Sequence, residues 1–241
     1  ALYGWDKEYG LHVKEVKDFK ASKYLVSNAE FLTFIEERGY ENEAFWSEEG
    51  WKWKCYKNAT MPLFWRKNEE GYALRVMAEE IPMPWSWPVE INYLEAKAFC
   101  NWKSAKEGKP IRLPSEEEWY VLRDLHVKTD EPFWDKAPAN INLEYFASSV
   151  PVDTFAFGDF YDVIGNVWQW SETPINGFDG FSVHPLYDDF SVPTFDDRHN
   201  LIKGGSWIST GNEIIRSSRY AFRRHFYQHA GFRYIESSEP V

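Results

Sequence analysis

The chain has 241 residues and a formal net charge of −11, with 44% hydrophobic residues, 19% aromatic residues and 13 Trp. The length allows one large domain or two small ones, and because no stretch reads as a linker we expect a single domain over residues 1–241. The acidic balance argues against nonspecific nucleic-acid binding, and the lack of a leader or of an apolar run of about 18 residues argues against a membrane span.

Composition favours a core of aromatic side chains in a cytoplasmic protein. Each ring buries roughly 150–250 Å², so rings can form a dense core with little regular secondary structure. Cys55 and Cys100 are too few for a disulfide framework, and low cysteine content is typical of a reducing cytoplasm. The chain opens at Ala1 rather than at a methionine, which indicates a processed or excised piece of a longer protein.

The first third of the chain predicts one helix and several strands. Val13–Phe19 has the composition of a strand. Ser27 followed by Glu30 forms a capping-box pattern before an apolar helical run, and Gly39 stands where a C-terminal glycine belongs. Two further short strands are expected at Trp51–Tyr56 and Leu74–Met77.

The middle of the chain predicts two more helices. Asn92 with Glu95 marks the start of the first, which should end at Gly108. Ser115 with Glu118 marks the start of the second. Both starts are followed by apolar residues at helical spacing, so each helix should bury one side.

A turn at Gly165-Asn166 follows, with Trp168 and Trp170 on one face of an extended segment. The pattern favours a core turn with two buried indoles. An alternative is a calcium loop that uses oxygens of Asn166 and Gln169 together with backbone carbonyls. Calcium prefers several carboxylates, and Gln169 is neutral, which weakens this alternative.

The last third combines a long segment without periodicity and a group of short strands. Residues 173–198 form a long loop, and loops of this length are usually functional or disordered. The aromatic residues of this segment favour an ordered loop. Antiparallel strands should close the domain at Leu201–Lys203, Ser217–Phe222 and Gly231–Ile235.

Basic residues gather near the C-terminus of this acidic chain. They either pair with internal carboxylates or form a clamp for a ligand carboxylate, because guanidinium groups bind carboxylates in bidentate fashion. Strand alternation would send Arg219 and Arg223 to the same face. His225 and His229 are four residues apart, but the segment does not read as a helix and lacks a third ligand, so we expect no metal site within this chain.

Several segments in fixed order resemble the formylglycine-generating-enzyme family, which has a C-type-lectin-like fold. They are Pro88–Glu90, Ile111–Trp119, Gly165–Trp170, Gly204–Trp207 and Gly231–Arg233. The resemblance implies an α+β domain with few helices, short antiparallel strands and much irregular structure. The family carries reactive cysteines in the arginine-rich segment, where this chain has Tyr220-Ala221-Phe222, so we do not expect formylglycine formation.

A narrower resemblance covers Tyr3–Asp6, His199–Glu213 and Ser218–Phe226, which are similar to the 5-histidylcysteine sulfoxide synthases of ovothiol biosynthesis. These enzymes, and the related ergothioneine sulfoxide synthases, use non-haem iron and O₂ to join a cysteine sulfur to a histidine imidazole. Their Fe(II) is held by histidines of an N-terminal helical bundle. Neither that bundle nor the methyltransferase domain often fused to these enzymes is expected in this chain.

The resemblance implies a substrate-pocket domain that works with an iron-binding partner domain or chain. It implies histidine, cysteine and O₂ as substrates and Tyr187 as the catalytic residue. Arg219, Tyr220, Arg223 and Trp207 are the expected substrate contacts. The alternative is a lectin-like module that binds a ligand without chemistry, since such folds serve both purposes.

Overall fold

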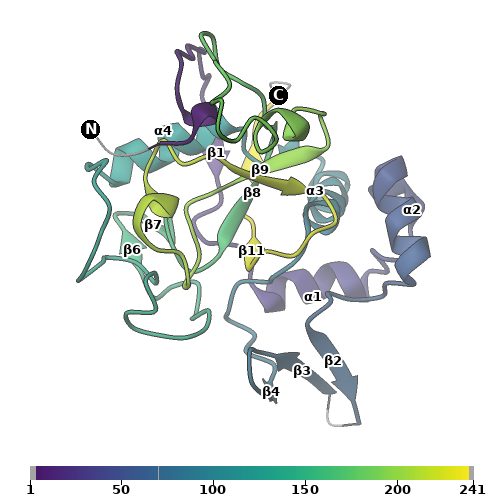
Figure 1. Ribbon diagram of the computed structural model, residues 1–241. Helices are drawn as coiled ribbons and strands as arrows, with labels where there is room; N and C mark the ends of the chain where they lie inside the picture. Colours follow the sequence, from purple (N-terminus) through teal and green to yellow (C-terminus); the bar gives the residue numbers. More distant parts are fainter. Residues whose placement is uncertain (1–3, 70, 239–241) are drawn as a thin grey trace.

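A computed structural model describes residues 4–69 and 71–238. Figure 1 shows helices around a central sheet, with a smaller sheet projecting on one side. The helices are α1 (Asn28–Glu36), α2 (Glu48–Lys57), α3 (Tyr93–Glu107) and α4 (Glu116–His126), with 3₁₀ turns η1 (Asp6–Glu8), η2 (Glu43–Phe45), η3 (Val192–Thr194) and η4 (Gly211–Ile214). The strands are β1 (Lys20–Ala21), β2 (Trp65–Asn68), β3 (Gly71–Arg75), β4 (Glu80–Pro82), β5 (Ile111–Arg112), β6 (Ala156–Phe157), β7 (Phe160–Tyr161), β8 (Trp168–Pro174), β9 (His199–Lys203), β10 (Tyr220–Arg223), β11 (Ala230–Gly231) and β12 (Ile235–Glu236).

The strands form small sheets, which confirms the predicted α+β class. The central sheet has the order β10-β9-β8-β11, a second sheet has the order β1-β12-β5, and β2-β3-β4 forms the projecting sheet in Figure 1. Neighbouring strands run antiparallel except for β11 and β8, which are parallel. The predicted closing strand at Leu201–Lys203 lies within β9, and the one at Ser217–Phe222 overlaps β10 only from Tyr220. The prediction of a single antiparallel strand at Gly231–Ile235 is wrong, because that segment touches β11, which is parallel to β8, at one end and β12, in another sheet, at the other.

Local capping determines where three of the helices begin. The Ser27 hydroxyl accepts a hydrogen bond from the Glu30 amide, and Asn92 and Ser115 form complete capping boxes. The assignment of Gly39 as the left-handed residue that ends α1 is wrong, because Arg38 has that conformation with φ 62°. Gly39 is required for another reason: a Cβ there would overlap the ring of Phe34.

Two predicted strands are wrong. Val13–Phe19 is irregular, and the strand β1 begins only after it. Trp51–Tyr56 lies within α2, which Ser47 caps at one end and the left-handed Asn58 closes at the other. The Trp-Lys alternation imitates a strand, but the cap and the left-handed residue define a helix. Leu74–Met77 overlaps β3 only in part.

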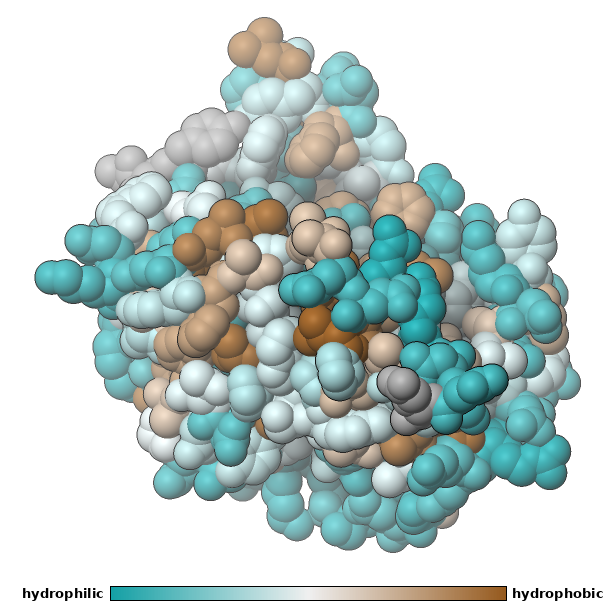
Figure 2. Space-filling model, turned by 90° about the horizontal axis from the view of Figure 1, so that it is seen from below, coloured by the Kyte–Doolittle hydropathy of each residue, from teal (hydrophilic) through white to brown (hydrophobic). Residues whose placement is uncertain are grey.

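Aromatic side chains build the core, as the composition predicts. Phe31 stacks on Phe99 at 5.5 Å between ring centroids, and Phe34 and Trp102 pack edge to face at 5.7 Å. On the underside of the molecule, Figure 2 shows apolar groups in small separate patches between polar side chains. Among residues 4–69 and 71–238, no helix is long and apolar enough to cross a membrane.

Candidate functional site

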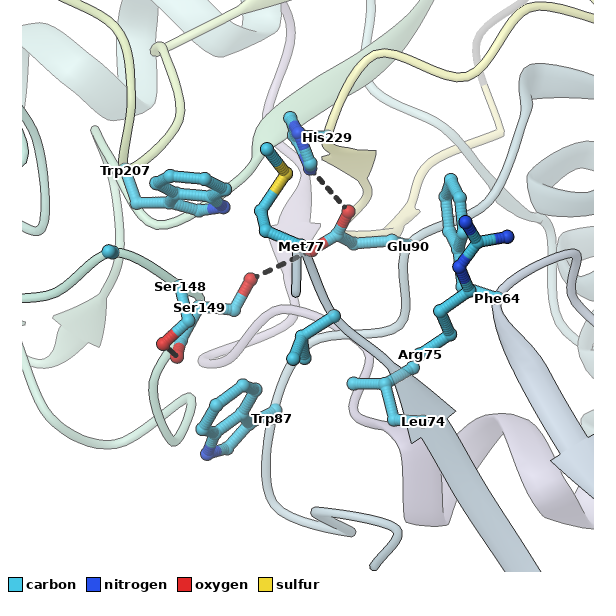
Figure 3. Close-up of a pocket in the computed structure, with 12 residues that line it drawn as sticks. Phe64, Leu74, Arg75, Met77, Trp87, Glu90, Ser148, Ser149, Trp207 and His229 are labelled. Atoms are coloured by element: carbon cyan, nitrogen blue, oxygen red, sulfur yellow. Dashed lines mark hydrogen bonds and ion pairs between the residues drawn. The ribbon is translucent and has the colours of Figure 1, made fainter. Parts of the chain in front are cut away.

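Two neighbouring cavities lie at the ends of β8 and β11. The polar cavity has a volume of about 510 Å³ and is lined by Trp168, Ser209, Thr210, Glu213, Tyr227 and His229 among others. The apolar cavity has a volume of about 240 Å³ and is lined by residues that include Phe64, Leu74, Trp87, Glu90, Trp207 and His229 (Figure 3). Phe64 and His229 line both cavities, so the two share a wall.

An aromatic row leads away from the polar cavity and consists of Trp168, Tyr220, Phe190, Trp5 and Tyr187. Trp168 contacts Tyr220 at 5.6 Å between centroids. The Lys7 ammonium lies 5.7 Å from the centroid of Tyr220 and 4.2 Å from that of Phe190, which links the strand to the long loop.

Tyr187 lies at the far end of the row. Its ring stacks on His184 at 4.2 Å and meets Trp5 edge to face at 5.2 Å. The Tyr187 side chain is half-buried, and the sheet residue Tyr220 is half-buried as well. Lys7 therefore joins two aromatic groups, Trp168–Tyr220 and Phe190–Trp5–Tyr187, and so connects the predicted substrate contact Tyr220 to the predicted catalytic tyrosine.

Asp6 anchors the loop that carries Tyr187. Its carboxylate is buried and accepts hydrogen bonds from the Ser191 hydroxyl and, at 3.2 Å, from the His184 amide. These two bonds hold the loop on both sides of Tyr187. The sequence did not identify Asp6, Lys7 or Trp5 as site residues. The one feature that could have pointed to them is the resemblance of Tyr3–Asp6 to the corresponding segment of the sulfoxide synthases.

We expect Asp6→Ala to release this loop. Losing two hydrogen bonds should reduce the local opening free energy by about 2 kcal/mol, or roughly 30-fold in hydrogen exchange across residues 184–191. Exchange followed by mass spectrometry measures this directly. Asp189→Ala, an exposed change in the same loop, is the control and should alter exchange by less than about threefold. Unchanged exchange in Asp6→Ala would show that the loop is held by its aromatic contacts alone.

The structure separates the two arginines that were expected to face one ligand. Arg219 is only 2% exposed, and its guanidinium donates to both oxygens of Glu116 at 3.0 Å. It also donates to the carbonyl of Lys7 at 2.8 Å, which ties the η1 turn to the core. Arg223 is exposed at the end of β10. The shared-face expectation is therefore wrong, because Arg219 precedes the strand and turns inward to an internal carboxylate.

Asn166 and Gln169 make hydrogen bonds within the fold. The Asn166 side-chain oxygen accepts from the Val150 amide at 2.9 Å, and its NH₂ group donates to the Val150 carbonyl and to Asp162. The Gln169 oxygen accepts from Arg233 at 2.9 Å. Both side-chain oxygens that a calcium ion would use thus face protein donors.

The histidines of the C-terminal segment have different surroundings. His229 donates or accepts through Nδ1 at 2.8 Å from Glu90, and this contact raises the pKa of His229 against the opposing effect of burial. His225 is exposed. Within the described part of the chain, no three His, Cys, Asp or Glu side chains lie together so that they could hold a metal ion.

A buried carboxyl group stands behind the polar cavity. Glu95 is fully buried and accepts hydrogen bonds from the Tyr40 hydroxyl at 2.6 Å and from Tyr227 at 3.5 Å. Burial raises the pKa of Glu95 to about 7, and the hydrogen bonds oppose this only in part. Tyr227 lines the polar cavity and donates to Glu95, so it connects the cavity to a carboxyl group that can hold a proton near neutral pH.

Solved structures define the class of this fold. PvdO from Pseudomonas aeruginosa superposes with a TM-score of 0.64 at 18% identity, covering 96% of this chain and 85% of PvdO. At this identity the likeness concerns the fold, which is an α+β domain.

The chain belongs to the family of sulfatase-modifying factor enzyme 1-like domains, whose model matches residues 2–238. Hercynine oxygenase of Mycolicibacterium thermoresistibile is 31% identical over 234 residues, which cover 90% of this chain and 50% of that protein. Ergothioneine biosynthesis protein 1 of Schizosaccharomyces pombe is 25% identical over 96% of this chain and 26% of its own length. The chain thus spans half or less of the length of these relatives.

Proposed function

We propose that this chain is the substrate-binding domain of an oxygenase that joins a cysteine sulfur to a histidine imidazole, as in ovothiol- or ergothioneine-type biosynthesis. The observation that carries the proposal is the similarity to hercynine oxygenase over nine tenths of the chain. The resemblance of the arginine-rich segment to histidylcysteine sulfoxide synthases favours histidine and cysteine as substrates, with O₂ as the oxidant. The volume of the polar cavity, about 510 Å³, falls in the range of small-molecule sites. Tyr220 does not line this cavity itself but contacts its wall residue Trp168, and Tyr187, Trp207 and Arg223 lie outside its lining.

Iron enters this proposal from outside the chain. The described residues offer no cluster of three or more metal-binding side chains. We propose, as the resemblance to the sulfoxide synthases implies, that Fe(II) is held by a helical-bundle domain or chain that docks on this one. Calcium has no proposed role, because Asn166 and Gln169 serve the fold.

In the proposed site, Tyr187 supplies a proton or hydrogen atom, Tyr220 and Trp207 contact the substrates, and Arg223 binds a substrate carboxylate. Arg223 is exposed, so it can reach a ligand without breaking an internal ion pair. Arg219 has a positioning role instead, since it binds the carbonyl of Lys7, the residue that bridges Tyr220 and Phe190.

Binding measurements on the complete protein test this assignment. Histidine and histamine differ by the carboxylate, so histidine should bind more tightly, and Arg223→Lys should reduce that preference by about five- to tenfold. Arg216→Lys, which changes an arginine paired with Asp124, is the matched control. Equal preference in Arg223→Lys and the parent would remove Arg223 from the site. Binding of both amino acids without any coupled product would instead favour a ligand-binding module.

A further inference from the structure

Of the residues that the proposed chemistry uses, only Trp207 lines the apolar cavity. Tyr187, Tyr220 and Arg223 do not line it. Its walls come from segments far apart in the sequence: the residue before β2, the end of β3 and the residues after it, the segment before α3, the loop at residues 147–149, the segment after β9, and the residue before β11 (Figure 3). A cavity of about 150 Å³ lined by Leu, Ile and Phe can hold benzene. The volume here, about 240 Å³, therefore suits a benzene-sized ring with a few additional atoms.

Two of the charged groups of this cavity, Glu90 and His229, are paired with one another, and the third, Arg75, has an exposed side chain. Glu90 accepts a hydrogen bond from the Ser149 hydroxyl at 3.0 Å through one oxygen and contacts His229 at 2.8 Å through the other. Figure 3 shows both contacts along one wall. Because both oxygens of Glu90 already have partners, this carboxylate does not require a cationic ligand.

One polar group facing the cavity has no partner within the described residues. Trp207 is only 3% exposed, and its Nε1–H donor is buried without an acceptor. The nitrogen edge of the ring points towards the middle of the cavity in Figure 3. By contrast, the indole of Trp170 donates to the Ile91 carbonyl at 3.0 Å. Leaving a buried N–H unpaired costs about 1–3 kcal/mol, which a bound acceptor would recover.

We infer that the apolar cavity is a second ligand site, which binds a small uncharged molecule with an apolar ring and one carbonyl oxygen. The ring contacts the apolar walls formed by Phe64, Leu74 and Trp87. The carbonyl accepts a hydrogen bond from Trp207 Nε1. This inference stands on the cavity itself, which shares only Trp207 with the proposed substrate contacts, so binding of the probes tests it separately from the proposed oxygenase function.

A matched pair of probes tests the site. Acetophenone and α-methylstyrene have nearly the same shape, but only acetophenone has the acceptor. Ligand-observed NMR titration of the chain should show that acetophenone binds about five- to tenfold more tightly, the contribution of one neutral hydrogen bond. In Trp207→Phe this preference should vanish while α-methylstyrene still binds. Trp85→Phe, a change outside the cavity lining, should leave the preference intact.

A second variant guards against loss of folding in Trp207→Phe. Met77 is 68% exposed and lines the cavity, so Met77→Trp should obstruct it without disturbing the core. Both probes should then bind at least about fivefold more weakly. The inference is overturned if neither probe binds at millimolar concentration, if both bind equally, or if acetophenone keeps its advantage in Trp207→Phe.

Discussion

Replacing Glu116 with Gln is expected to destabilise the domain by about 3–5 kcal/mol, because two buried cations would lose their shared carboxylate. Glu116 is 1% exposed and accepts from Arg219 at 3.0 Å and from Lys203 at 3.2 Å. Lys203 is buried as well. Urea unfolding measures the change. Glu48→Gln removes an exposed pair with Lys52 and is the control, with an expected loss below about 1 kcal/mol.

The same carboxylate gives the stability a defined dependence on pH. Burial alone would raise the pKa of Glu116, but the charges of Lys203 and Arg219 outweigh it and lower the pKa from 4.5 to about 2. A carboxyl group with a lowered pKa in the fold stabilises it above the unfolded value and loses that contribution as the pH falls. The difference in unfolding free energy between the parent and Glu116→Gln should therefore be largest above pH 4.5 and should decrease as the pH falls towards 2. A constant gap across this range would contradict the ion-pair explanation.

Changing Tyr187 to Phe in the complete, iron-bearing protein is expected to redirect the reaction. Under the proposed function Tyr187 is the proton or hydrogen-atom donor: a phenol keeps its proton at neutral pH, and His184 and Trp5 hold the ring of Tyr187 in one orientation. General acids typically contribute at least about 100-fold to the step they serve. The variant should bind both amino acids about as well as the parent, yet form mostly oxidised cysteine in place of the coupled sulfoxide.

Product partition, quantified by mass spectrometry, checks this expectation. Tyr24→Phe changes a tyrosine on another part of the domain, packed against Tyr161, and should leave partition unchanged. If Tyr187→Phe matches the parent in both partition and turnover, Tyr187 is a packing residue, and Tyr220 and then Tyr227 become the next candidates. An Asp6→Ala protein should show part of the same shift, because it frees the loop without removing the phenol.

The features that sequence analysis predicted well depend on neighbours in the chain. The caps at Ser27, Asn92 and Ser115 involve residues three positions apart, so a short pattern is enough. The segment Trp51–Tyr56 was misread because its alternation satisfies a strand pattern, while the decisive signals, Ser47 and Asn58, lie just outside it. Local patterns therefore locate helices where the cap is legible and fail where alternation imitates a strand.

The candidate site depends on partners that no local pattern connects. Arg219 turns inward to pair with Glu116. The two residues are neighbours in space but lie 103 residues apart in the sequence, so no local pattern connects them. Asp6 reaches Ser191 across 185 residues. The resemblance identified the family, whereas the internal role of Arg219 and the anchoring role of Asp6 emerged only when these segments were placed side by side.

The pairing of β1 with β12 has a consequence for how the domain folds. Lys20 lies opposite Glu236 in that ladder, and β12 also separates β1 from β5. Because β12, the middle strand of this sheet, follows all the other described strands in sequence, the sheet cannot close until almost the whole domain has left the ribosome. Contacts of such sequence separation slow folding and prolong exposure of apolar surface. Ribosome-stalled chains that end before Ile235 should therefore remain sensitive to protease, and native protection should arise in a single late step.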